Sequence, residues 1–231
     1  MQNKFISSVI LPYFSMYQKQ DIEIGIRSVS GEWLFASDKL IQQFPKPVTH
    51  QEIIGAGDEF LNNLFGNNEV TLFCNKINEL LCNSLFPLDT LIDNVRSDGS
   101  ISFSTTIPLF DNDNRYVARR FLTRPVDRLV INEGVLKRYR ARFNRRGVFL
   151  NKIFPISLTH KEEIVLGLLL LGYSQKQIAG VLMCSRSAVA KFIAEDLCAC
   201  FEMSGSSSKL LVEKLISLGY DHWIPERLIF N

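Results

Sequence analysis

The stretch Ser174–Phe192, SQKQIAGVLMCSRSAVAKF, predicts two short helices joined by a tight turn. Ser174 follows Gly172-Tyr173, where the glycine can end one helix and the serine hydroxyl can cap the next. Ser185 opens a second helix in the same way. Apolar residues at helical spacing follow both serines, namely Ile178, Ala179 and Leu182, then Ala188, Val189, Phe192 and Ile193. Two capped helices that pack together fit a helix-turn-helix whose second helix enters a DNA groove.

Residues on both sides of this stretch make the pattern more specific. They are Leu158, Thr159, Glu162, Val165, Leu166, Gly172, Ser174, Lys176, Ile178, Ala179, Leu182, Ser185 and Val189. Over residues 157–220 the chain resembles the C-terminal DNA-binding domain of the LuxR/GerE transcription factors. The resemblance implies four helices, of which the third is the recognition helix and the fourth is often a dimer contact.

The chain departs from this family at three places. The family usually has Thr-Val-Lys where this chain has Ala188-Val189-Ala190, and a histidine where it has Phe192. The segment from Phe192 to the turn at Gly205 is also slightly longer than usual. The phosphate contacts of the family therefore do not all carry over to this chain.

Candidate DNA-binding residues follow from the expected faces of the two helices. Ser174, Gln175, Lys176 and Ser185 lie at helix starts, and Arg186, Ser187, Ala190 and Lys191 fall on the side opposite the apolar stripe. Arg186 is the best candidate for a guanine edge, because its forked donors match two acceptors. Lys176, Lys191 and the amides of Ser174 and Gln175 are candidates for phosphate contacts that set the register. Ala190 could meet a thymine methyl group or no part of the DNA.

The distribution of charge adds a second candidate region. Residues 1–128 carry a net charge of −3, residues 129–157 of +6 and residues 158–231 of −1. A net negative DNA-binding domain is unusual. We therefore expect the basic segment to track DNA phosphates, with Arg140, Arg142, Arg145 and Arg146 as the candidate contacts. The alternative is a solvated helix face that only connects two domains.

The N-terminal part predicts a mixed domain. Residues 21–28 and 33–36 are expected strands, residues 38–44, 52–65 and 69–86 are expected helices, and residues 100–110 and 116–123 are the arms of an expected hairpin. This order resembles a PAS domain, as do Gly31–Leu40 and Ile107–Asn114. The resemblance implies a domain that binds a small molecule or dimerises. No cofactor is identified, and a small-molecule ligand in this domain stays open beside a plain packed core.

Composition and motifs exclude several classes of protein. With 231 residues, 46% of them hydrophobic and 22% charged, the chain is expected to be globular. It lacks the GxGxxG, GxxxxGK[ST], HExxH and GxSxG motifs, so we expect no enzyme, no catalytic residue and no metal site. Five cysteines without CxxC spacing, no long apolar segment and no leader predict a cytoplasmic protein without a membrane contact.

The sequence thus predicts an α+β fold class, a PAS-like antiparallel-sheet domain followed by an all-α four-helix helix-turn-helix domain. The expected domains are residues 1–128, a basic helical connector at 129–156, and the DNA-binding domain at 157–231. This combination resembles enterobacterial regulators, including plasmid-transfer activators of the TraJ type. The expected function is that of a dimeric transcriptional regulator whose partners are double-stranded DNA, a second copy and RNA polymerase. The alternative is a regulator whose helix-turn-helix binds a protein instead of DNA.

Overall fold

The computed structural model describes residues 4–66, 68–82, 86–93, 95–151, 156–205 and 207–230. These residues form two compact units. One unit is Met1–Arg128 together with Arg146–Phe149, and the other is Leu129–Arg145 together with Leu150–Asn231. We describe each unit by itself.

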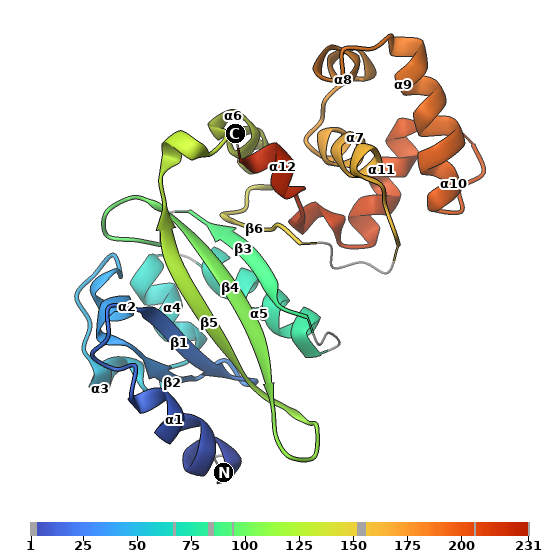
Figure 1. The fold of residues 1–231 in the computed structure, drawn as a ribbon. Coiled ribbons are helices and arrows are strands. Elements are labelled where there is room, and N and C mark those ends of the chain that lie inside the picture. The colour runs from blue at the N-terminus through green and yellow to red at the C-terminus, as the bar shows by residue number, and fades with distance from the viewer. Residues whose placement is uncertain are drawn as a thin grey trace. The chain divides into compact units, whose positions relative to one another are not determined.

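The N-terminal unit is built on one antiparallel sheet. Its strands are β1 (Glu23–Ser28), β2 (Trp33–Ala36), β3 (Leu88–Ile92), β4 (Ile101–Phe110), β5 (Tyr116–Val126) and β6 (Gly147–Phe149). They lie in the order β2-β1-β5-β4-β3-β6, so β1 pairs with β2 on one side and with β5 of the long hairpin on the other (Figure 1). The expected strands 21–28 and 33–36 and the expected hairpin are confirmed. The strands β3 and β6 were not predicted.

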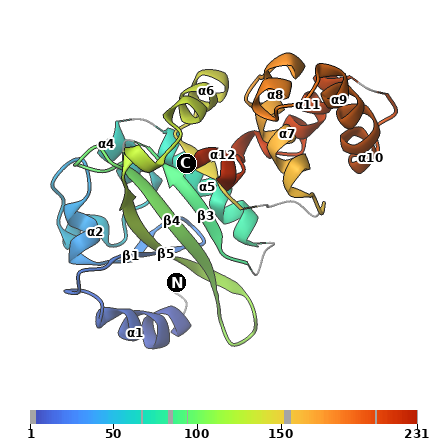
Figure 2. The ribbon, with the colours of Figure 1, turned by 45° about the horizontal axis from the view of Figure 1, so that its top comes forward.

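Helices cover both faces of this sheet (Figure 2). On one face, a helical segment of η1 (Ile6–Ile10) and α1 (Leu11–Ser15) packs Ile6, Ile10 and Phe14 against Ile24 and Ile26. The other face carries α2 (Asp38–Gln42), α3 (His50–Ile53), α4 (Asp58–Phe65) and α5 (Glu69–Cys82). The helix expected at 52–65 is split, because Gly55 has a positive φ of 84° that ends the first turn.

The C-terminal unit is helical. It contains α6 (Glu133–Phe143), α7 (His160–Leu170), α8 (Gln175–Val181), α9 (Arg186–Phe192) with its continuation η3 (Ile193–Leu197) and α10 (Cys198–Cys200), α11 (Ser208–Ser217), η4 (Tyr220–His222) and α12 (Glu226–Ile229). Its core joins residues of α7, α8, α9 and α11, with Leu166, Ile178, Ile193 and Leu215 fully buried. The predicted α+β class, a PAS-like sheet domain followed by a helical helix-turn-helix domain, is confirmed.

The segment expected as a helical connector has two parts with different neighbours. Helix α6 belongs to the C-terminal unit, where Ile131 bridges to Phe230 and the amide of Asn132 donates to Ile229 over 2.6 Å. Strand β6 instead joins the sheet, because Val148 pairs with Leu91 of β3. Residues 152–155 lie outside the described residues. The basic segment is therefore shared between the units.

Candidate nucleic-acid interface

Helix α8 begins at a capping box. The Ser174 hydroxyl accepts from the amide of Gln177, and the Gln177 side chain accepts from the Ser174 amide over 2.9 Å. Gly172, with a φ of +79°, ends α7 two residues earlier. The expected glycine stop and serine cap are therefore both confirmed. The amide and the hydroxyl of Ser174 are both engaged in the cap. Lys176, in the first turn of the helix, is an exposed cation.

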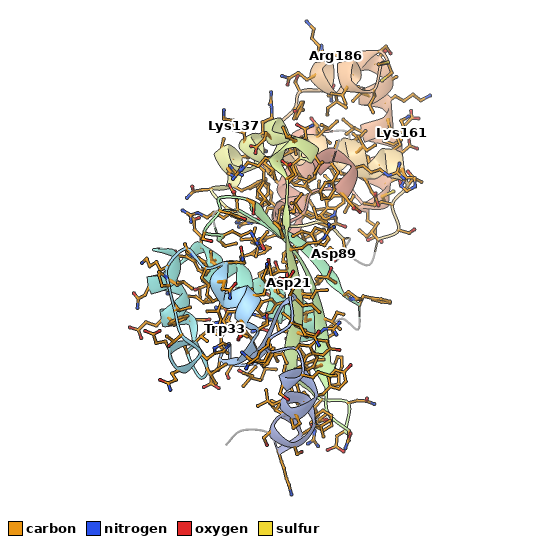
Figure 3. All side chains as sticks on the ribbon, turned by 60° about the vertical axis from the view of Figure 1, so that its left-hand side comes forward. Asp21, Trp33, Asp89, Lys137, Lys161 and Arg186 are labelled. Carbon is orange, nitrogen blue, oxygen red and sulfur yellow. The ribbon has the colours of Figure 1, made fainter. Side chains whose placement is uncertain are left out.

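Helix α9 starts in a similar way. The Ser185 hydroxyl accepts from the amide of Ala188 over 3.1 Å and lies 2.9 Å from the hydroxyl of Ser187. Arg186 follows directly and is exposed on the surface of the unit (Figure 3). Its place in the first turn leaves its guanidinium open to an outside acceptor, as direct readout of a guanine requires.

The exposed and buried faces of α9 differ from the expected ones at Ala188, Ala190 and Phe192, the last of which is half-buried. Ser187 and Lys191 are exposed, as expected, and Val189 is buried. Ala188, expected in the buried stripe, is exposed, and Ala190, expected on the DNA-facing side, is half-buried. The helix packs through Val189 and Ile193 at i and i+4, which turns Ala188 outward.

Two lysines near α9 are held by neighbouring side chains. The ammonium of Lys161 on α7 lies 4.3 Å from the centre of the Phe192 ring. The Lys191 ammonium lies 3.7 Å from the carboxylate of Glu195, one helical turn later. Phe192 thus has a local role as the surface on which Lys161 rests. Lys161 was not among the residues selected from the sequence.

Helix α6 brings basic residues to the start of α8. The guanidinium of Arg138 lies 4.1 Å from the centre of the Tyr173 ring, just before Ser174. Arg142 is also close, since a methyl group added at Gly172 would lie 2.5 Å from its Nη1. Both arginines are exposed, as is Lys137 on the same helix. We call Lys137, Arg138, Arg142 and Lys176 the basic surface.

The other arginines of the basic segment have partners inside their own units. Arg145 pairs with Asp221 in the C-terminal unit, and Arg146 pairs with Glu69 over 3.0 Å in the N-terminal unit. Arg140 is half-buried. Of the four arginines selected from the sequence, Arg142 is therefore the one that the structure leaves exposed.

The low charge of the helix-turn-helix region is offset by α6. Within its structural boundaries the C-terminal unit contains 13 lysines and arginines and 9 aspartates and glutamates, a net charge of +4. The net charge of −1 belonged to a segment that left α6 out. The net charge is therefore +4 when residues are grouped by their contacts and −1 when the segment 158–231 is taken from the sequence.

An exposed apolar tip lies in the turn between α8 and α9. Met183 is 95% exposed and has a φ of +51°, and Val181 beside it is 52% exposed. This tip could not be predicted, because Val181 and Met183 belong to a continuous apolar run in the sequence. Large exposed apolar side chains side by side favour contact with an apolar surface.

Comparison with known proteins finds similarity only among solved structures. No family model matches the sequence, and no curated protein matches it. A phage VqmA in complex with DPO is 18% identical over 96% of this chain and 94% of that chain, with a TM-score of 0.45. The Vibrio cholerae VqmA dimer without target DNA, described as a LuxR-type receptor, is 17% identical over 96% and 94%, with a TM-score of 0.41. The PAS domain of Bordetella pertussis BvgS is 15% identical over 57% and 94%, with a TM-score of 0.44.

Within the part of the chain that the structure describes, no helix is by itself long and apolar enough to cross a membrane.

Proposed function

We propose that this protein is a sequence-specific DNA-binding transcriptional regulator that acts as a homodimer, with an N-terminal domain that senses a signal. One observation carries the proposal: α8 and α9 form a serine-capped helix pair that presents Arg186 at the start of the second helix. Such a pair places the first turn of the second helix against base edges. The basic surface beside α8 supplies cations for the flanking phosphates.

The roles of the residues follow from their positions. Arg186 reads a base, whereas Ser187, Lys176 and Lys191 contact the DNA backbone and set the register. Arg142 and its neighbours on α6 add affinity that does not depend on sequence. Arg145 and Arg146 hold their own units together through Asp221 and Glu69 and are assigned no phosphate contact.

The test is a selection of the full-length protein against random duplexes, followed by fluorescence anisotropy on the enriched site. A homodimer should enrich two half-sites about one helical turn apart, ~34 Å. Arg186→Ala should cost about 1–3 kcal/mol of binding free energy and relax specificity at one base pair. Arg142→Ala should weaken binding to all sequences alike and lower the salt slope by about one.

Lys209→Ala is the matched control, because Lys209 is an exposed cation on α11 with only a long contact to Glu213, 3.9 Å away. It should leave both affinity and salt slope unchanged. No enrichment of any duplex at low salt would refute DNA binding. The exposed tip of Met183 and Val181 would then favour the second candidate, a helix-turn-helix that binds a protein partner.

A further inference from the structure

The N-terminal unit contains a cavity of about 100 Å³ between the sheet and helices α2, α4 and α5. Aromatic rings form one side, with Trp33 packed edge-on against Phe44 and Phe121. Hydroxyl-bearing residues of β3, β4 and β5 form the sheet side, namely Thr90, Ser102, Ser104, Thr106 and Thr123. A sheet face that packs against helices normally carries large apolar side chains. Because the hydroxyl-bearing side chains on this sheet face are small, they leave an open and polar space between the sheet and the helices.

Two arginines face this cavity from directly opposite positions on neighbouring strands. Arg27 of β1 pairs in register with Arg119 of β5, and both residues line the cavity. Arg27 is 1% exposed and Arg119 is 2% exposed. Like charges directly opposite each other in a sheet are destabilising, and burial makes the repulsion costlier. A pair of this kind indicates that a negative group belongs between the two guanidinium groups.

The hydrogen bonds of the two guanidinium groups do not use all of their donors among the described residues. Arg27 donates from Nε to the Gly31 carbonyl over 2.8 Å and from Nη2 to the Asp58 carboxylate over 2.8 Å. Arg119 donates from Nη1 to the Cys74 carbonyl over 2.9 Å. Arg27 Nη1 and Arg119 Nη2 are buried without a hydrogen-bond partner among the described residues.

Arg119 also lacks a carboxylate partner within the part of the chain that is described, whereas nearby Arg96 has a complete one. Arg96 donates to both oxygens of Glu23, over 2.6 and 2.9 Å. Burial lowers the pKa of Arg119, and the charge of Arg27 lowers it further. The cavity therefore keeps one buried positive charge that the described residues do not balance.

We propose that this cavity binds a short aliphatic carboxylate, held by Arg27 and Arg119 with its apolar tail against Trp33 and Phe121. The planar fork of a guanidinium matches a carboxylate, and the aromatic side suits a hydrocarbon tail better than a fully hydrated phosphate. An engineered cavity of ~150 Å³ in another protein takes up benzene. The cavity of this protein is smaller, so we expect it to admit a short aliphatic acid and to exclude benzoate. The role of this ligand as the signal of the regulator rests on the proposed function. The binding of the ligand to the cavity does not depend on that function.

The test is thermal unfolding of the full-length protein, without DNA, in sodium acetate, butyrate, pyruvate, benzoate or phosphate at equal ionic strength. Butyrate or pyruvate should raise Tm in a saturable way, because a ligand of the native state stabilises it by mass action. Arg119→Met should weaken this binding about tenfold or more, because it removes a charge-assisted contact. The same variant without ligand should unfold at an equal or higher temperature than the unaltered protein.

Arg124→Met is the matched control. Arg124 lies on the same strand, exposed, with its guanidinium 4.7 Å from the centre of the Phe103 ring. It should keep the full effect of butyrate. Ser104→Leu is a second variant, which should fill the cavity and abolish the effect with the fold retained.

Three outcomes would overturn the assignment. They are no carboxylate effect on the unaltered protein, an undiminished effect in Arg119→Met and Ser104→Leu, and an effect of phosphate or benzoate as large as that of butyrate. Because no DNA is present, failure here leaves DNA binding untouched. Failure of the duplex selection likewise leaves this ligand site standing.

Discussion

The interiors of the two units are built from different residues. In the C-terminal unit the core around Leu166, Ile178 and Leu215 is apolar, and the hydroxyls of Ser174 and Ser185 cap helices at the surface. In the N-terminal unit the sheet face under the helices carries hydroxyl residues and the charged residues Glu23, Arg27 and Arg119. Arg96, in the segment after β3, pairs with Glu23, and all four charged residues are buried. The N-terminal unit thus buries several charged side chains, whereas in the described part of the C-terminal unit the buried charged residue is Asp221.

This contrast indicates where in each unit a ligand or partner is expected to bind. Burial of a polar ligand in an apolar core is costly, so we expect the C-terminal unit to act through its surface. Buried charges cost stability unless they are fully paired, and they persist where the surrounding structure holds them for a use. We therefore expect the N-terminal unit to bind a ligand through the polar and charged groups in its interior.

Breaking the buried ion pair of the N-terminal unit should have the largest effect. Glu23→Gln removes the charge opposite Arg96, and both side chains are almost completely buried. An uncompensated buried charge costs about 3–5 kcal/mol. Urea denaturation, followed by hydrogen exchange in β1 and β5, measures the loss of free energy of unfolding.

Asp98→Asn is the control for this prediction. Its carboxylate lies 3.6 Å from Nε of the same arginine but is half exposed. Solvent screening should keep the loss below about 1 kcal/mol. Equal losses in the two variants would show that the interior position of Glu23 does not matter, and the contrast between the units would fail.

Removing an apolar side chain from the C-terminal core should have the next largest effect. Leu215 on α11 is fully buried, so Leu215→Ala should cost about 3 kcal/mol through lost burial and the cavity that is left. Leu210→Ala, on the same helix but exposed, should cost less than about 1 kcal/mol. Thermal unfolding of both variants gives the comparison. A small loss in Leu215→Ala would mean that this core is as loosely filled as the N-terminal one.

The C-terminal fold could be predicted from the sequence because its signals are local. Gly172, Ser174 and Ser185 mark where helices end and begin, and apolar spacing within each helix marks its buried face. The face of α9 was correct at Val189 and wrong at Ala188, because small residues fit either side of a helix. That α6 is part of the C-terminal unit could not be predicted, for a different reason. Its contact with Tyr173 joins residues far apart in the chain, and no spacing encodes it.

The N-terminal interior could not be predicted because its strand pattern is inverted. Alternation in β4 favours Phe103 and Ile107 as the buried set, yet both are only half-buried, while Ser102, Ser104 and Thr106 are buried. The apolar set lies on the opposite face of the sheet from the cavity. Strand periodicity shows that two faces differ, but which face the helices cover is decided by the connections.

The smallest expected difference in stability between the units comes from the loss of one serine helix cap in each unit. Ser37 caps α2 and is fully buried, since its hydroxyl also donates to the Ile22 carbonyl over 2.6 Å and accepts from the Ile24 amide over 3.1 Å. Ser174 caps α8 at the surface. Ser174→Ala should therefore cost about 1 kcal/mol, the usual value of a cap. Ser37→Ala should cost about 2 kcal/mol, because it also removes the partner of the buried Ile24 amide and of the half-buried Ile22 carbonyl. Urea denaturation of both variants measures the difference, and equal costs would mean that water reaches the strand ends beside Ser37.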